Sequence, residues 1–171
     1  MSHINIEIKA KCYNQDKIRE ILKSKGADFR GIDHQIDTYF RVNTGRLKLR
    51  EGNIENALVF YNRSDQEGPK QSNVTLLKVE PKSEIKDILT KALGVLIVVD
   101  KLREIYFIEN IKFHIDSVKN LGKFVEIEAI DTGDIPKAKL EEQCKHYLEL
   151  FGIKKEDMIS VSYSDLLLKI K

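Results

Sequence analysis

Short segments of this chain alternate apolar and polar residues with a period of two, and many of the polar positions are charged. The clearest case lies near the start, where isoleucines alternate with Asn5, Glu7 and Lys9. A period of two places successive side chains on opposite faces of a β-strand. The pattern predicts strands near 4–12, 34–43, 46–51, 56–63, 73–80, 95–107, 110–118 and 123–131.

Helical signals separate some of these strands. Asn14 is a suitable N-cap for a helix that ends at Gly26, a second helix begins at Ser83, and a third begins near Pro136. A final short helix is expected at about 162–170. No regular strand–helix–strand rhythm runs through the chain, which favours an antiparallel sheet and the α+β class.

Length and composition narrow the class of protein. The 171 residues are enough for one domain, expected over 1–171. The net charge is only +2, from 29 basic and 27 acidic residues, whereas a nonspecific nucleic-acid-binding protein usually has a larger excess of basic residues.

The sequence predicts no membrane-spanning or targeting segment. The longest apolar run, 95–99, is too short to span a bilayer, and charged residues follow the first residues too soon for a signal peptide. We expect a cytoplasmic protein without a membrane segment. The polar stretch 64–72 is expected to be an exposed loop.

Several strand faces carry charges of a single sign. The cationic faces hold Arg46, Lys48 and Arg50 on one strand and Lys101 and Arg103 on another, and an acidic face holds Glu126 and Glu128. Like charges two residues apart repel unless an opposite charge lies between them. A polyanion would compensate the cations, and Mg²⁺ or Mn²⁺, which prefer oxygen ligands, would compensate the carboxylates. For any single pair, a solvated sheet face is the simpler explanation.

The order of these charged segments resembles a known family. The segment Asn5-Ile6-Glu7-Ile8-Lys9 is similar to the ExExK signature of the CYTH superfamily, which includes class IV adenylate cyclases and thiamine triphosphatases. Segments 35–51, 99–103 and 114–128 resemble further blocks of the same family, and they occur in the family order across almost the whole chain.

This resemblance implies a closed eight-stranded antiparallel β-barrel, a triphosphate tunnel with flanking helices. It implies a substrate that carries a triphosphate, such as ATP, thiamine triphosphate or inorganic triphosphate, with Mg²⁺ or Mn²⁺ as cofactor. The implied catalytic residues are Glu7 and Lys9. The implied metal ligands are Glu7, Asp116, Glu126 and Glu128. The implied phosphate contacts are Arg46, Lys48, Arg50, Lys101 and Arg103, with Lys78, or Lys70 in its place, as a further basic position.

One departure from the family pattern and several alternatives stay open. Asn5 stands where the signature has its first glutamate, so a carboxylate is missing and catalysis is in doubt. The resemblance does not choose between a cyclase and a hydrolase, nor does it give the number of metal ions or exclude a homodimer. A non-catalytic binder of polyphosphate or nucleotides is one rival. A basic-faced barrel that binds RNA is another, although few aromatic residues are available for base stacking.

Overall fold

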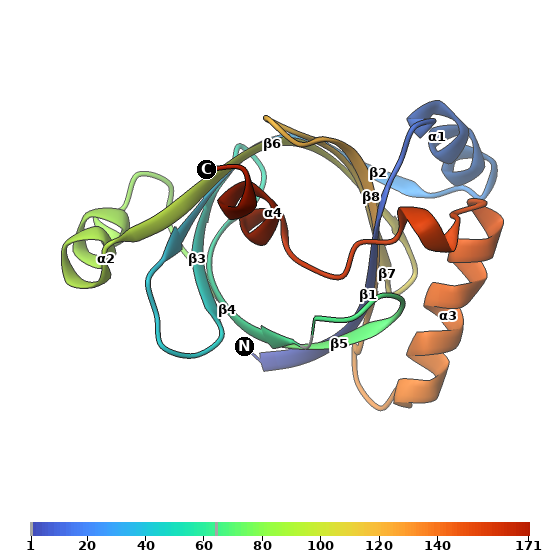
Figure 1. Cartoon of the computed structure of the whole chain (residues 1–171). Coiled ribbons are helices and arrows are strands. Elements are labelled where there is room, and N and C mark those ends of the chain that lie inside the picture. The colour runs from blue at the N-terminus through green and yellow to red at the C-terminus, as the bar shows by residue number, and fades with distance from the viewer. Residues whose placement is uncertain (1, 64) are drawn as a thin grey trace.

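The expected barrel is confirmed. In residues 2–63 and 65–171, which the computed structural model describes, eight strands close in the order β1-β5-β4-β3-β2-β6-β7-β8 (Figure 1). Every neighbouring pair is antiparallel. The strands are β1 (Ser2–Lys11), β2 (Asp28–Phe40), β3 (Arg46–Glu51), β4 (Asn56–Arg63), β5 (Lys70–Lys78), β6 (Val95–Ile108), β7 (Ile111–Val118) and β8 (Gly122–Ile130).

The helices lie outside the ring or across its opening. They are α1 (Gln15–Ser24), α2 (Ile85–Leu93), α3 (Lys137–Leu150), the short 3₁₀ helix η1 (Lys155–Asp157) and α4 (Tyr163–Lys169). Figure 1 shows α1 and α3 beside β1, β7 and β8, and α2 on the other side of the barrel. Among the described residues, no helix is long and apolar enough to cross a membrane.

The main apolar core lies outside the barrel wall. Ile6 and Ile8 of β1 point outward and are buried with Leu22 of α1 and with Leu140 and Cys144 of α3. Because the period of β1 is two, the same strand turns Asn5, Glu7 and Lys9 into the barrel. Helix packing therefore stabilises the wall from outside and leaves the interior free for charged side chains.

A second apolar cluster lies at one end of the barrel. Tyr163 and Leu167 of α4 pack against Tyr39, Tyr61 and Phe124 of the wall. The Phe124 and Tyr163 ring centroids are 4.9 Å apart. Helix α4 is held by a capping box at Ser162, so the C-terminal segment covers this end as an ordered element.

Two element boundaries differ from the sequence-based predictions. Strand β2 begins at Asp28 rather than near 34, because its first residues pair with the end of β6 around an irregularity near Gly31. Strand β5 begins at Lys70, so the expected loop over 64–72 is shorter, and its residue 64 lies outside the described residues. The extension of β5 comes from pairing with β1, where Lys70 is opposite Glu7. Such long-range pairing leaves no local sequence signal.

The packing of α3 gives a stability prediction. Leu140 is 1% exposed between α3 and the barrel, whereas Ile88 of α2 is 59% exposed. We expect Leu140→Ala to lower the free energy of unfolding by about 2–5 kcal/mol, because it removes buried methyl groups and leaves a cavity. Ile88→Ala should change it by less than about 0.5 kcal/mol. Urea unfolding of both variants checks this, and equal effects would contradict the assignment of the core to the outer wall.

Candidate active site

The barrel encloses one large, strongly charged cavity of about 720 Å³. This volume lies within the range typical of small-molecule sites. Among the residues that the structure describes, eight lysines and arginines and five glutamates line it. They are Lys9, Lys48, Arg50, Arg63, Lys78, Lys101, Arg103, Lys112, Glu7, Glu55, Glu80, Glu126 and Glu128. The cavity therefore carries more cations than carboxylates, as a polyanion site requires.

The cavity carboxylates of β1 and β8 are neighbours. In the β1–β8 ladder Glu7 lies opposite Glu128, and Lys9 lies opposite Glu126. Arg63, which ends β4, reaches past β5 to form an ion pair with Glu7. The two strands thus place three glutamates on one wall, where two of them are directly opposite each other. This arrangement provides oxygen donors of the kind that Mg²⁺ and Mn²⁺ prefer.

Asn5 is a fourth oxygen-bearing residue on this wall. The side chain is 3% exposed, and its Nδ2 donates a hydrogen bond to Glu128 Oε1 at 2.5 Å. Its Oδ1 is buried and has no hydrogen-bond partner among the described residues. Buried amide oxygens are nearly always satisfied, so this one is a candidate ligand atom. The oxygens of Asn5, Glu7, Glu126 and Glu128 are chemically suited to a divalent cation. In the described structure Glu7, Glu126 and Glu128 do not form a cluster of ligand atoms within 4.8 Å of one another, so the side chains would have to move together to bind one ion.

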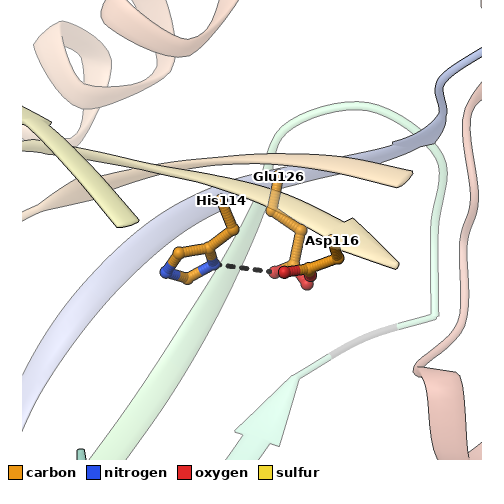
Figure 2. A group of neighbouring side chains, drawn as sticks. All are labelled: His114, Asp116 and Glu126. Carbon is orange, nitrogen blue, oxygen red and sulfur yellow. Dashed lines mark ion pairs between the residues drawn. The ribbon is translucent and has the colours of Figure 1, made fainter. Parts of the chain in front are cut away.

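His114, Asp116 and Glu126 form a second group of candidate ligands (Figure 2). Their ligand atoms lie within 4.8 Å of one another, and His114 Nδ1 is 3.7 Å from Glu126 Oε2. However, Arg103 already donates to Asp116 at 2.8 Å and to Glu126 at 2.9 Å. The hydroxyl of Tyr163 also donates to Asp116 at 2.7 Å. Asp116 is fully buried behind Arg103, so metal binding by this residue would require Arg103 to move.

The charge states within this group follow from its cations. Burial opposes ionisation of Glu126, but Arg103 and Lys9 hold the pKa of Glu126 well below its usual range. Burial lowers the pKa of His114, and Arg103 lowers it further. Arg103 and Lys9 therefore favour the ionised form of Glu126, and burial together with Arg103 disfavours the protonated form of the neighbouring His114.

A buried carboxylate organises the opposite wall. Asp37 of β2 is fully buried and accepts hydrogen bonds from Arg50 Nε and Nη2 at 2.9 and 2.8 Å and from Lys101 Nζ at 2.7 Å. Lys48 Nζ lies 3.4 Å from the same carboxylate. Burial opposes its ionisation, yet Arg50, Lys101 and Lys48 keep the pKa of Asp37 well below its usual range. Three cations from β3 and β6 thereby converge on one part of the cavity.

Comparison with known proteins decides the family. The model of the CYTH domain matches residues 3–163. A Methanocaldococcus jannaschii protein named "Putative adenylate cyclase" is 32% identical, over 95% of this chain and 98% of that protein. The chain belongs to the CYTH family.

Solved structures share the fold of this chain. The PH1012 protein of Pyrococcus horikoshii is 26% identical, with a TM-score of 0.77 over 95% of this chain and 98% of that one. A Hippeastrum protein, whose structure is described as an adenylyl cyclase candidate with a dominant triphosphatase activity, shares the fold. Its identity is 15% and its TM-score 0.67, over 99% of this chain and 96% of that one.

The remaining basic positions from the CYTH resemblance are not all in the cavity. Arg46 does not line it, because Arg46 Nη2 donates to Asp165 of α4 at 2.6 Å. Lys78 is exposed and lies at the cavity margin. Lys70 is 1% exposed, and its Nζ donates to the carbonyl oxygen of Ser160 at 2.8 Å. Of the two open alternatives, Lys78 therefore reaches the cavity, and Lys70 fastens the segment that leads into α4.

Several cavity residues were not assigned a role from the sequence, among them Arg63, Lys112, Glu55 and Tyr163. Arg63 and Lys112 continue the period-two faces of β4 and β7, so the pattern itself could have suggested them. Glu55 lies in a turn, and its position has no such signal. Tyr163 reaches the cavity from α4, where its ring lies 3.9 Å from Lys9 Nζ. Only the tertiary structure shows that contact.

The buried position of Lys70 predicts a pH dependence of stability. Burial, together with the nearby charges of Arg63 and Lys9, lowers the pKa of Lys70 to about 7. In the unfolded chain a lysine has a pKa of about 10.4, so between about pH 7 and pH 10 the unfolded state binds more protons. Stability from this group therefore rises with pH across that window, by up to about 1.4 kcal/mol per pH unit, and is constant below it.

The variant Lys70→Met should lack this rise. Urea unfolding at pH 6, 7.5 and 9 is expected to show the wild-type protein gaining stability relative to Lys70→Met as the pH increases. Parallel pH profiles for the two proteins would contradict a lowered pKa at Lys70.

Proposed function

We propose that this CYTH protein is a divalent-metal-dependent enzyme that acts on a substrate with a triphosphate group. The reaction would be either cyclisation of ATP to cyclic AMP and pyrophosphate or hydrolysis of the triphosphate. The supporting observation is the division of the cavity into two walls. Cations gathered by Asp37 form one wall, and the glutamates of β1 and β8 form the other. A triphosphate with a bound cation matches both walls.

The cations have distinct tasks in this proposal. Lys48, Arg50 and Lys101 would bind phosphate oxygens, and Asp37 behind them fixes their positions. Prepositioned cations stabilise the charge that develops during phosphoryl transfer without having to reorganise. Arg103 would join them after releasing Glu126, to which it donates at 2.9 Å. These residues would hold the attacking and leaving groups in line.

Glu7, Glu126 and Glu128, with Asn5 Oδ1, would hold Mg²⁺ or Mn²⁺. When bound, such an ion supplies charge neutralisation at the phosphates and lowers the pKa of an attacking water or hydroxyl group. Asp116, the remaining acid expected from the sequence, would take part only after its hydrogen bonds to Arg103 and Tyr163 are exchanged.

Lys9 is placed to assist the departing phosphate. It lies between Glu126 and the ring of Tyr163 and is 5% exposed. Burial lowers the pKa of Lys9, although Glu126 opposes the shift. A lysine with a lowered pKa gives up a proton more readily, so Lys9 could neutralise or protonate the leaving oxygen.

The choice between the two reactions is not built into the fold. The Methanocaldococcus jannaschii relative is named for cyclase activity, and the structure of the Hippeastrum protein is described by a dominant triphosphatase activity. One relative resembles this chain in sequence and the other in fold, so membership of the family does not by itself select either chemistry. The nucleophile that reaches the triphosphate, water or the ribose hydroxyl, would determine the product.

The first test measures turnover. We expect release of phosphate or pyrophosphate from ATP, inorganic triphosphate or thiamine triphosphate in the presence of Mg²⁺ or Mn²⁺, and none in EDTA. Glu126→Gln should lower the rate by at least about 100-fold, because it removes a charge from the proposed metal wall. Product chromatography distinguishes cyclic AMP with pyrophosphate from phosphate alone.

The matched control is Glu149→Gln, the same chemical change at an exposed position on α3. It should leave the rate unchanged. If the folded protein binds triphosphate but turns over none of the three substrates, the chain is a polyphosphate- or nucleotide-binding module rather than an enzyme. The absence of a carboxylate at Asn5 is the observation that would explain such a result.

A second test restores the missing carboxylate. Asn5→Glu places a negative charge beside Glu128 and near Glu7, so we expect Mn²⁺ to bind about tenfold more tightly than to the wild-type protein. Asn5→Gln, which keeps an amide, should not strengthen binding. Calorimetric titration measures both affinities in the absence of substrate. An unchanged affinity in Asn5→Glu would place the metal away from this wall.

A further inference from the structure

The turn between β3 and β4, residues 52–55, is fastened at one end of the cavity by a buried carboxylate. Asp33 of β2 is fully buried and accepts hydrogen bonds from the backbone N–H groups of Ile54 and Glu55 at 2.9 and 3.0 Å. Gly52 packs so closely on the same carboxylate that a Cβ atom there would lie 2.6 Å from Asp33 Oδ1. The backbone of the turn is therefore held in one position.

This turn presents the side chain of Glu55 to cavity cations. Glu55 accepts a hydrogen bond from Lys112 Nζ at 2.5 Å and lies 3.4 Å from Arg50 Nη1. Gln35 Nε2 also donates to it at 2.9 Å and at the same time to Asp33 at 2.8 Å. Burial opposes its ionisation, but Lys112 and Arg50 lower the pKa of Glu55. The Glu55 carboxylate thus forms ion pairs with Lys112 and Arg50 at this end of the cavity.

The rest of the cationic wall lies toward the opposite end of the cavity. Lys9 and Lys101 lie 3.9 and 6.0 Å from the ring of Tyr163, in the cluster that covers the other end of the barrel. Lys112, in contrast, is the second residue of β7 and pairs with Phe107 near the end of β6. The cations therefore form a row that runs from Tyr163 to Lys112, and Glu55 stands at the Lys112 end of this row.

We propose that Glu55 limits the length of the phosphate chain that the cavity accepts. This inference rests on the proposed function. A triphosphate bound by the inner cations would end before Glu55. A longer chain would extend past Arg50 onto Lys112, where its next phosphate meets a carboxylate of like charge. Asp33 holds the backbone of the turn, and Gln35 and Lys112 donate to the Glu55 carboxylate, so moving this side chain aside would break those hydrogen bonds.

Chain-length dependence of binding tests this proposal. The affinities of inorganic triphosphate and pentaphosphate are measured by calorimetry in EDTA and with Mg²⁺. Glu55→Gln keeps the shape of the side chain and removes the charge, so it should raise the pentaphosphate-to-triphosphate affinity ratio by about tenfold. Glu80→Gln removes a charge from an exposed residue that also lines the cavity, and should change the ratio by less than about twofold.

The outcomes separate this inference from the proposed function. If the wild-type protein binds neither phosphate chain, the triphosphate site itself is wrong. If it binds both, but Glu55→Gln changes the two affinities equally, Glu55 does not limit the length of the bound phosphate chain. The same conclusion follows if Glu80→Gln changes the affinity ratio as much as Glu55→Gln does. Weaker binding of both chains in Glu55→Gln would likewise overturn the proposal and make Glu55 a support for Lys112. Should Glu55→Gln fail to fold, Glu55→Asp, which withdraws the charge from Lys112, is expected to shift the ratio the same way by a smaller factor.

Discussion

The ion pairs around Asp37 are the constraint on which the interior of this barrel depends. Buried charges are costly unless each has a close partner of opposite sign. Asp37 gives Lys48, Arg50 and Lys101 such a partner from behind the cavity surface. Asp116 does the same for Arg103. These carboxylates stabilise a row of cations inside the barrel, and the cations still line the cavity.

A charged interior also determines where the hydrophobic core must lie. Since the inner faces of the strands are polar, the apolar faces need cover on the outside, and α1 and α3 supply it over β1, β7 and β8. Closure of the sheet leaves no unpaired strand edge. The strands of this wall are thus buried on both faces. Their outer faces are apolar and lie under helices, and their inner faces are polar and line the cavity, so apolar and polar residues alternate with a period of two.

This period explains how much could be predicted from the sequence. It places Glu7, Lys9, Lys48 and Lys101 on inner faces, and the CYTH resemblance adds closure of the barrel. It does not reveal partners across the barrel. The pairing of Lys70 with Ser160 and of Arg46 with Asp165 joins residues far apart in the chain. Which basic residues face the cavity was therefore decided by tertiary contacts, for which the local pattern holds no information.

The internal ion pairs would couple the binding of phosphate to the binding of metal in the proposed site. Arg63 and Arg103 are now engaged by Glu7 and Glu126. A polyanion that attracted the two arginines would take one partner from each of these glutamates, and a cation that attracted the glutamates would release the arginines. When both ligands arrive together, each carboxylate and each arginine exchanges one partner for another. Binding of phosphate and binding of metal would therefore strengthen each other by the same factor, because thermodynamic coupling between two ligands is reciprocal.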